Sequence, residues 1–474
     1  MKYTKAFLTG KSSANTYRNL KEVIIMSSFE KNLSEGNVAK QLVLFSLPFL
    51  ASNIIQSLYS VADMLIVGRF SGTTSMSGVN LGSQVTLILT NIVVGLCAGG
   101  TVLIAQYLGA KRRKDMQETT ATLLTTLTIA AVAITVLMLI LKKPILHLIQ
   151  TPAESFAEAD RYLTVTVLGL IFIFGYNVFS AVMRGMGDSK RPLYFVLIAC
   201  ITNVILDLVL VAGLKMGALG AAIATVFSQA VSMITCIVVM IRNDFVFDFK
   251  PSSFHFIKEE FHTLLRTGLP LSIQMVGTNF SFLILTTFIN RAGGVAASAA
   301  AGIVNNFNGF AILPEAAISS AASAMIAQNM GKKDVKRSSK TMHCCLVLCI
   351  GVSLVVFTLM HIFPEQIFHL FGVKEDVLVY GMPYIFAFSF EYVGLPFIMS
   401  FNTVSTATGN GWITLVTNMI SAFIVRIPLA YVLAFLCELG VRGIAISIPI
   451  ATAVGAIISF LFYKAGIWKK HILL

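Results

Sequence analysis

The first long apolar stretch of the chain, residues 41–68, contains one acidic residue, Asp63, and no basic residue within a helical turn of it. About 20 apolar residues cross the hydrocarbon core of a bilayer, so this stretch is long enough to span one. An unpaired carboxylate in hydrocarbon is costly and therefore points to a function. Tyr59 precedes Asp63 by four residues, which puts both on one face of a helix. We expect Asp63 to take up and release a cation that drives transport; the alternative is an acid satisfied by structural hydrogen bonds.

A second candidate acid, Asp207, lies in the apolar segment ITNVILDLVLVAG. Asn203 precedes it by four residues and shares its helix face, and Thr225 lies in the middle of the next apolar run. Carboxylate, amide and hydroxyl oxygens suit a hard cation, and two carboxylates in one dry site also favour the uptake of a proton. The predicted cation-coupling site therefore comprises Asp63, Asn203, Asp207, Thr225 and Tyr59, and it is open to H⁺ or Na⁺.

The second half of the chain carries other ionisable residues in its apolar runs. Glu391, in FAFSFEYVGLPF, is a candidate contact for a cationic substrate, or else a hydrogen-bonded packing acid. Glu315 is a further acid of that half. Arg426 is expected to pair with an acid or with carbonyl groups inside the bundle, because an Arg that faces lipid is unfavourable.

Asn177, Glu391 and Met275 are the predicted substrate-binding residues. Methionine is flexible and polarisable, so it suits a cavity that accepts many ligands, although most methionines simply pack between helices. The same two interpretations apply to the methionines in apolar runs generally, among them Met183, Met233, Met275 and Met399.

The composition is that of a membrane protein. Of the 474 residues, 56% are hydrophobic and only 12% are charged, and the mean hydropathy is +0.82. A soluble domain carries about 25% charged residues. Twelve apolar runs are long enough to span a membrane: 41–68, 79–107, 118–141, 158–183, 193–213, 218–241, 263–289, 296–327, 340–363, 380–405, 413–436 and 441–464. We therefore predict an all-α integral membrane protein with twelve transmembrane helices, surrounded by lipid.

The net charge of +13 does not indicate a nucleic-acid partner, because most basic residues lie in short loops between apolar runs. Loops rich in Lys and Arg follow the second, fourth and eighth runs. We expect the loop after the fourth run to include Arg184. The loops that alternate with them hold one or two basic residues. Since basic loops stay in the cytoplasm, this pattern predicts that both termini are cytoplasmic.

The sequence lacks the motifs of several other functions. The seven cysteines fall in or at the ends of apolar runs, so we expect neither a disulfide framework nor a metal site made of them. No metalloprotease, nucleophile-elbow or P-loop motif occurs, so we expect no enzyme, no cofactor and no ATP-driven pump. Residues 1–36 are polar and basic and lack the apolar core of a signal peptide, and Met26 is a possible alternative start.

The two halves of the chain repeat each other. Leu47 and Pro48 recur 222 residues later as Leu269 and Pro270. At the same spacing Arg69 matches Arg291, Gly72 matches Gly294, Gln106 matches Gln328, Gly109 matches Gly331 and Gly187 matches Gly409; one residue further, Gly217 and Gly220 match Gly440 and Gly443. We therefore predict two six-helix lobes related by a parallel repeat, with the sites near the midplane. The predicted parts are an N-terminal extension (1–36), an N-lobe (37–241), a cytoplasmic linker (242–262) and a C-lobe (263–474).

From about residue 37 to 465 the chain resembles the multidrug and toxic compound extrusion (MATE) transporters of bacteria. The resemblance rests on SVADMLIVG, AQYLGAKRRKD with its copy AQNMGKKDVKR, RGMGDSKRP, and NVILDLVLVAG followed by GALGAAIATVFSQ. It implies two six-helix lobes that open as a V, a place in the bacterial cell membrane, and export of cationic drugs in exchange for protons or Na⁺. By the resemblance, Asp63, Asn203, Asp207 and Thr225 match the cation site of the amino lobe, and Tyr59 matches an aromatic residue near it.

Some branches of that family also carry a carboxylate in the seventh helix, where this chain reads PLSIQMVGTNFSFLIL without an acid. Coupling in the amino lobe is therefore favoured. The resemblance does not decide between H⁺ and Na⁺, and we expect a monomer. The alternative function is a flippase for a lipid-linked saccharide on a related two-lobe fold, whose cavity should be rich in Arg and Lys.

Overall fold

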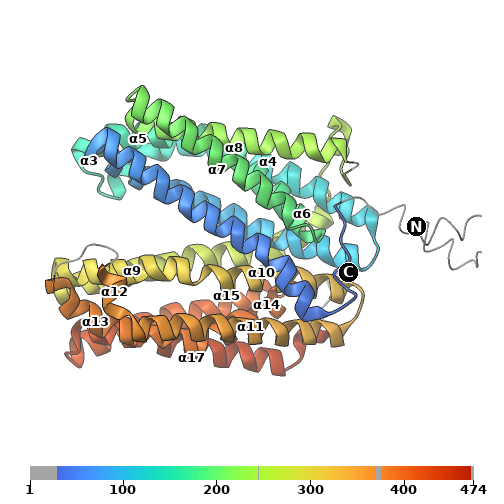
Figure 1. Ribbon diagram of the computed structural model, residues 1–474. Coiled ribbons are helices and arrows are strands. Elements are labelled where there is room, and N and C mark those ends of the chain that lie inside the picture. Colours follow the sequence, from blue (N-terminus) through green and yellow to red (C-terminus); the bar gives the residue numbers. More distant parts are fainter. Residues whose placement is uncertain (1–28, 244, 370–374, 471–474) are drawn as a thin grey trace, which may run out of the picture.

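The computed structural model describes residues 29–243, 245–369 and 375–470 (Figure 1). Most of the predicted N-terminal extension, including Met26, lies outside this range. The described residues are largely helical, and no strand occurs among them. The predicted all-α membrane fold is confirmed, because nine of these helices are long and apolar enough to cross a bilayer.

The helices alternate with short connections. The first half contains α3 (Val38–Gly109), α4 (Arg113–Leu148), α5 (Ala153–Leu168), α6 (Leu170–Gly185), α7 (Lys190–Asp207) and α8 (Gly217–Arg242). The second half contains α9 (Lys258–Ala311), α10 (Leu313–Gly331), α11 (Val335–Ile362), α12 (Pro364–His369), α13 (Glu375–Ser389), α14 (Glu391–Ala407), α15 (Gly411–Met419), α16 (Ile427–Tyr431), α17 (Gly440–Lys464) and α18 (Ile467–Lys470). Three π-helical segments extend α7 and flank α16: Leu208–Gly213, Ile420–Arg426 and Val432–Leu436. Because α9 begins at Lys258, the end of the predicted linker 242–262 is helical.

Two helical stretches are more than twice as long as one membrane span requires. Val38–Gly109 has 72 residues and Lys258–Gly331 has 74, against about 20 for a bilayer core. Each joins two helices across a kink at a glycine with non-helical backbone, Gly72 (φ 79°, ψ 178°) and Gly294 (φ 61°, ψ −150°). The helices α5 and α6, bent by 50°, are a tenth candidate span. Counting each long stretch as two spans then accounts for the twelve apolar runs of the sequence.

The sequence repeat has a counterpart in the backbone. Left-handed φ values, which favour glycine, recur at the spacing of the repeat. Besides Gly72 and Gly294, the matched pairs are Lys111 and Lys333 (φ 60° and 61°), Gly187 and Gly409 (87° and 80°), and Gly217 and Gly440 (59° and 53°). The two halves therefore turn at corresponding points of the chain.

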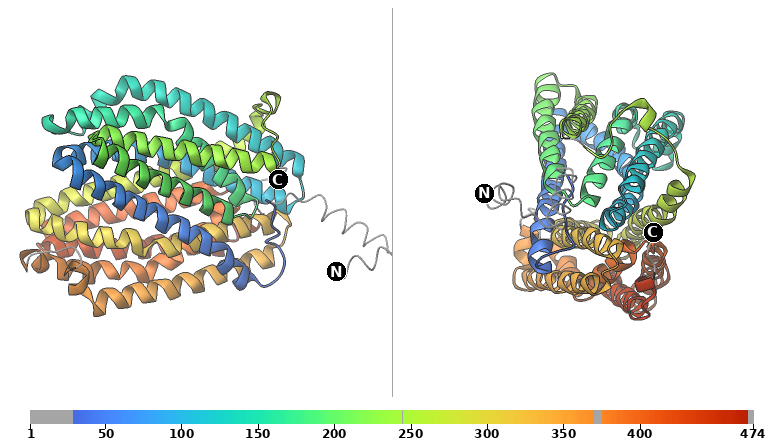
Figure 2. Two further views of the ribbon diagram at one scale, coloured as in Figure 1. Left: turned by 45° about the horizontal axis from the view of Figure 1, so that its top comes forward. Right: turned by 90° about the vertical axis from the view of Figure 1, so that its right-hand side faces the viewer.

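The helices of the two halves lie in two groups, with α4 to α8 on one side and α9 to α17 on the other (Figures 1 and 2). The first helix of α3 crosses between the groups. Its start, with Leu42 and Phe45, packs against α10 and α11 of the second half. Its far end, with Val67, packs against α5 and α8 of the first half. A tilt or rotation of this helix would therefore change the packing of both groups of helices.

At one end of the molecule, the segment 29–37 contacts both halves and three loops rich in basic residues. Glu30 pairs with Arg113 at 2.7 Å, and Lys31 pairs with Asp188 at 3.1 Å. On the other side, Arg337 donates to the carbonyl oxygens of Gly36 at 2.8 Å and Glu35 at 2.9 Å, and to Oε1 of Gln41 at 2.7 Å. Gln328 donates to the carbonyl oxygen of Lys31 at 3.0 Å. The segment thus holds the two halves together at this end.

The ends of α3 and α10 cross beside this segment with the symmetry of the repeat. A Cβ atom at Gly109 would lie 1.9 Å from the carbonyl oxygen of Gln328, and one at Gly331 would lie 2.0 Å from that of Gln106. Both positions therefore require glycine, because any side chain would overlap the backbone of the opposite half.

Candidate functional site

The acids Asp63 and Asp207 meet inside the first half. Asp63 lies in the first helix of α3, and Asp207 is the last residue of α7. Their exposed fractions are 7% and 0%, and the two carboxyl groups are in direct interaction. The Oδ1 atom of each has no hydrogen-bond partner among the described residues. Two buried carboxyl groups with free oxygen atoms need a proton or a cation between them.

Asn203 and Thr225 complete the polar surroundings of this pair. When the side-chain amide of Asn203 is oriented with its nitrogen toward Asp207, it donates to Oδ2 of Asp207 at 2.8 Å. Its oxygen then accepts from the backbone N–H of Thr225 at 3.2 Å. Asn203 is fully buried. The structure therefore brings the predicted coupling residues of α3, α7 and α8 together, and the i, i+4 spacing of Asn203 and Asp207 has the expected effect.

Two tyrosines border the acid pair. The hydroxyl of Tyr59 donates to Oγ1 of Thr225 at 3.4 Å. Tyr162 of α5 is buried and lies near both Asp63 and Thr225. It fits there because Gly82 has no side chain: a Cβ at that position would lie 2.6 Å from the Tyr162 ring. Tyr162 is not among the residues predicted from the sequence, because a lone tyrosine in an apolar run belongs to no recognisable motif.

The backbone next to Asp207 is unusual. The π-helical segment Leu208–Gly213 follows it directly, and such segments often occur at functional sites. The oxygen atoms gathered here, from carboxyl, amide and hydroxyl groups, are of the kind that binds H⁺ or Na⁺. No group of three His, Cys, Asp or Glu residues that could hold a metal ion occurs in the described part of the chain.

A cavity of about 550 Å³ lies between the halves and is lined from both. All three predicted substrate-binding residues, Asn177, Glu391 and Met275, line it. A second cavity of about 280 Å³ lies in the first half, and Asn177 and Tyr59 line it. Asp63 and Asp207 line neither cavity, but Tyr59 and Ser228, which line the smaller one, both bond to Thr225 beside the acid pair.

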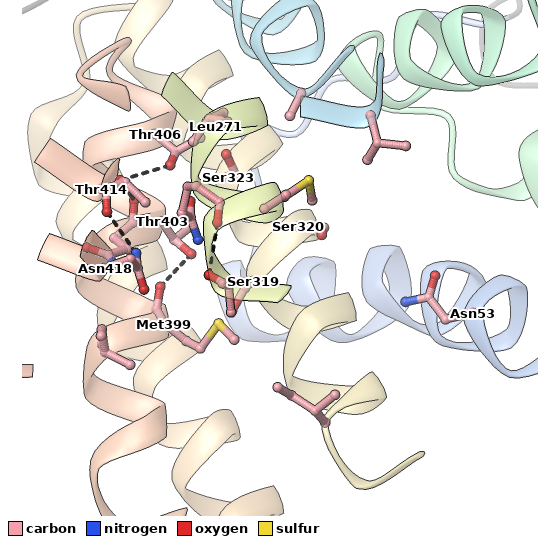
Figure 3. A pocket seen from close by; sticks show the side chains of 18 of the residues that line it. Asn53, Leu271, Ser319, Ser320, Ser323, Met399, Thr403, Thr406, Thr414 and Asn418 are labelled. Atoms are coloured by element: carbon pink, nitrogen blue, oxygen red, sulfur yellow. Dashed lines mark hydrogen bonds between the residues drawn. The ribbon is translucent and has the colours of Figure 1, made fainter. Parts of the chain in front are cut away.

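The wall of the large cavity is rich in hydroxyl and amide groups. Figure 3 shows Asn53 of α3 opposite the wall formed by the second half. On that wall the hydroxyls of Thr406 and Thr414 are 3.3 Å apart, and Asn418 donates to the carbonyl oxygen of Thr414 at 2.8 Å. Met399 lines the same cavity as Met275, whereas Met183 and Met233 pack in the core of the first half. Both interpretations of the methionines therefore apply, each to different residues.

The second half has its own buried acids, Glu315 and Glu391. Glu315 is fully buried, and the hydroxyl of Ser353 donates to its Oε1 at 2.5 Å. Glu391 is 8% exposed, and the hydroxyl of Thr452 donates to its Oε1 at 3.4 Å. One oxygen of each acid, Oε2, lacks a hydrogen-bond partner among the described residues. Glu315 and Glu391 are thus each paired with a hydroxyl group, whereas Asp63 is paired with a second carboxyl group, that of Asp207.

The expectation about Arg426 is met in part, and the one about Arg184 was wrong. Arg426 was expected to pair with an acid or with carbonyl groups inside the bundle. It is buried there and its charge interacts with that of Glu391, but its Nε and Nη1 have no hydrogen-bond partner in the described part of the chain. Its guanidinium lies over the ring of Phe282 at 4.8 Å instead. Arg184 was counted as a loop residue, but it belongs to the last turn of α6 and lines the large cavity, with its guanidinium 4.9 Å from the ring of Phe49. Both positions depend on how distant helices pack, which a single sequence does not reveal.

Comparisons with known proteins agree on one family. The family model described as MatE matches the chain twice, over residues 48–209 and 270–432, which are the two halves of the repeat. The chain is 28% identical over 442 residues to a probable multidrug resistance protein, YpnP, of Bacillus subtilis, covering 92% of this chain and 97% of that protein. It is 24% identical over 428 residues to an FAD transporter of Shewanella oneidensis, covering 88% and 92%. A crystal structure of a MATE protein in complex with MaL6 has the same fold, with a TM-score of 0.86, 24% identity, and 91% and 97% coverage.

Proposed function

The chain belongs to the MATE family of membrane transporters, and from that premise we propose that it exports organic cations in exchange for protons or Na⁺ by alternating access. The observation that carries the proposal is the pair of buried carboxyl groups, Asp63 and Asp207, in a protein that also has a cavity between its two halves. A secondary transporter needs one site that changes charge and a second site that the substrate enters. In support of this, Tyr59 bonds to Thr225 beside the acid pair and lines the smaller cavity, and Asn177 lines both cavities.

The coupling follows from the surroundings of the acid pair. An ion that binds between Asp63 and Asp207 removes their repulsion and lets the first helix of α3 repack against α7 and α8. That helix lines the large cavity with Asn53 and Gln56, so its movement changes the cavity. Pro48, within the same helix, leaves one carbonyl group without its helical partner and permits bending. Coupling energies of 1–3 kcal/mol, about 5- to 150-fold in affinity, are typical of such linked sites.

Linkage between the two sites provides the test. The affinity of the purified protein for an ethidium-like cation should fall as protons or Na⁺ occupy the acid pair, and Asp63→Asn should abolish this response. The measurement is dye binding from pH 5 to 9, with and without Na⁺. If the affinity of the wild-type protein were independent of both ions, antiport would be excluded.

A flippase for a lipid-linked saccharide or another amphiphile is the second candidate function. It is favoured by the two arginines that line the large cavity, Arg184 and Arg426, since Arg binds phosphate groups well. The name of the Shewanella relative, an FAD transporter, likewise points to a phosphate-bearing substrate for that protein. Competition between ethidium and anionic lipid for the purified protein separates the two candidates.

We also propose that the end of the molecule with the segment 29–37 and its basic loops faces the cytoplasm of a bacterial cell. The 36-residue helix α4 offers a matched pair of reporters, because the Lys114 side chain is 86% exposed at one end and Leu148 is 81% exposed at the other. In a Cys437→Ser background, which removes the exposed native cysteine, an impermeant thiol reagent added to intact cells should label Leu148→Cys and spare Lys114→Cys. The reverse pattern would invert the orientation.

A further inference from the structure

Two adjacent residues of opposite charge, Glu30 and Lys31, fasten the segment 29–37 to the first half. Both carboxylate oxygens of Glu30 accept from Nη2 of Arg113 at 2.7 Å. The Nζ atom of Lys31 pairs with Oδ1 of Asp188 at 3.1 Å. Arg113 begins α4, and Asp188 lies between α6 and α7, so the two ion pairs engage two different loops of the first half. We call these two ion pairs the clasp.

Directly after the clasp, the segment is attached to the second half. The buried side chain of Gln328 donates to the carbonyl oxygen of Lys31 at 3.0 Å and accepts from the backbone N–H of Leu33. Leu33 packs with Leu42 in an apolar cluster that residues of α10 and α11 complete. Only Asn32 separates Lys31 from Leu33, and two residue steps reach about 7 Å at most. The segment has no slack, so one attachment must release if the halves part at this end.

The clasp can release without leaving a charge buried and alone. The side chains of Arg113 and Lys31 are 39% and 42% exposed, so water already reaches both cations. Asp188 is buried, but it keeps Nη1 of Arg191 at 2.6 Å. Glu30, whose side chain is 2% exposed, would move into water with the segment. A buried ion pair is hard to break when one charge is left behind without a partner, and here none is.

The attachment to the second half is harder to release. Leaving it would uncover the apolar side chains of Leu33, Leu42 and Phe45 and break both hydrogen bonds of Gln328. On the first half one apolar side chain, Phe29, would be uncovered. Since the cost of exposure grows with apolar area, we expect the segment to stay with the second half.

We propose that the clasp is the inner latch of the transporter, and that Glu30 and Lys31 leave the first half each time this end opens. The clasp then sets the balance between the states that are closed and open at this end. The segment leads through Gly36, with φ 79°, and the N-cap residue Asn37 into the helix that carries Asp63, so the latch and the ion site share one helix. This inference rests on the proposed function, since a latch at one end has a use only if the two ends open in turn.

An exchange of the two charges of one ion pair tests the latch. Glu30→Lys and Arg113→Glu should each raise the ratio of open to closed states at this end about tenfold, the effect of losing one charged hydrogen-bonded pair. The double variant restores the pair with reversed sign and should return the ratio to the wild-type value. Spin labels on Arg242→Cys and Lys336→Cys, exposed positions at this end of the two halves, report the opening as a distance distribution in a Cys437→Ser background.

Lys332→Glu is the matched control, because it reverses a charge that meets the segment on the second half, at Glu35. It should leave the distance distribution unchanged. A wild-type distribution in Glu30→Lys, or a double variant no closer to the wild type than the single ones, would overturn the latch. If Arg113→Glu fails to fold, Glu30→Lys and the crosslinks described next still decide.

Reversible crosslinks measure the same event through transport. A bis-methanethiosulfonate reagent that joins Glu30→Cys to Arg113→Cys should stop dye efflux, and a reductant should restore it. The same reagent across Glu35→Cys and Lys332→Cys ties the segment to the second half and should leave efflux intact. Efflux that survives the first crosslink, or stops only with the second, would show that the clasp does not release.

These measurements distinguish failure of the latch from failure of the proposed function. If dye binding responds to pH or Na⁺ through Asp63, while the clasp variants leave the distance distribution unchanged, antiport stands and the latch falls. If the clasp variants shift the distribution but dye binding ignores both ions, the latch stands and ion coupling falls.

Discussion

Asp63 and Asp207 of the first half correspond, 222 residues later, to Leu285 and Leu429 of the second. Where the first half buries two carboxyl groups in contact, Leu285 is 2% exposed and packs in the core of the second half. The backbone, in contrast, is repeated closely, with kinks at Gly72 and Gly294 that both have positive φ. Both halves thus turn at matching glycines, whereas the two buried acids of the first half have leucines as counterparts in the second. The repeated backbone belongs to the fold, and we propose that the unmatched acids serve ion coupling.

The largest difference between the halves should appear in ion coupling. Asp63→Asn or Asp207→Asn should abolish ion-driven efflux, because an amide cannot gain or lose the charge that a bound ion neutralises. Glu315→Gln removes an equally buried acid from the second half and should leave coupling in place, since Ser353 already satisfies one of its oxygens. The measurement is dye efflux from proteoliposomes with an imposed pH or Na⁺ gradient. Loss of coupling in Glu315→Gln alone would place the coupling site in the second half.

The next largest effect concerns a feature that the two halves share. Gly109→Ala and Gly331→Ala should each reduce the free energy of unfolding by about 1–3 kcal/mol, the usual cost of overpacking. The added Cβ atoms would lie 1.9 and 2.0 Å from backbone oxygens of the opposite half, so the two variants should behave alike. Thermal unfolding of the purified protein measures this.

Gly351→Ala is the control for these two variants, because nothing lies within 4 Å of a Cβ at that helical position. It should be neutral or slightly stabilising, since Ala favours helix over Gly. Strongly different effects at Gly109 and Gly331 would show that the two crossings are not equivalent, despite the repeat.

A single side chain, Arg337, should have a similar or smaller effect where the segment 29–37 contacts the second half. Arg337 makes three hydrogen bonds of 2.7–2.9 Å to this segment and to Gln41. Arg337→Ala should lower the free energy of unfolding by about 2 kcal/mol, since hydrogen bonds that involve a charged group contribute about 1.5–3 kcal/mol and are not additive. Lys336→Ala removes an exposed basic neighbour and should have no measurable effect. A melting temperature unchanged in Arg337→Ala would mean that the segment does not brace the second half.

Much of this arrangement can be predicted from the sequence. Apolar runs and the 222-residue repeat predict the helices, because only apolar helices can remain in hydrocarbon. The cost of a buried carboxylate likewise identifies Asp63 and Asp207. The region 69–78 was expected to be a loop because its apolar pattern breaks, but the structure keeps it helical except at Gly72, where one glycine suffices for the turn. The isolation of Arg426 depends on which helices meet, and no local pattern contains that information.

The smallest effects on stability and ion response should come from two tyrosines, Tyr59 in the first half and Tyr392 in the second. The hydroxyl of Tyr59 is 3.4 Å from Thr225, a long and weak bond, whereas that of Tyr392 donates to Oδ1 of Asn308 at 2.5 Å and is buried. Tyr392→Phe should therefore cost about 1 kcal/mol of stability, the usual net contribution of one hydrogen bond, because Asn308 is partly exposed at the large cavity; it should not alter the response to ions. Tyr59→Phe should leave stability within about 0.5 kcal/mol.

Tyr59→Phe should nevertheless change how strongly ions weaken dye binding, by a few-fold. The reason is position rather than bond strength: Tyr59 lines the smaller cavity and lies one helical turn from Asp63, so it lies between the acid pair and that cavity. Both variants need two measurements, thermal unfolding and dye affinity with and without the coupling ion. If Tyr59→Phe matched the wild type in both while Tyr392→Phe shifted the ion response, the path from ion to substrate would run through the second half, and the division of tasks between the halves would have to be reversed.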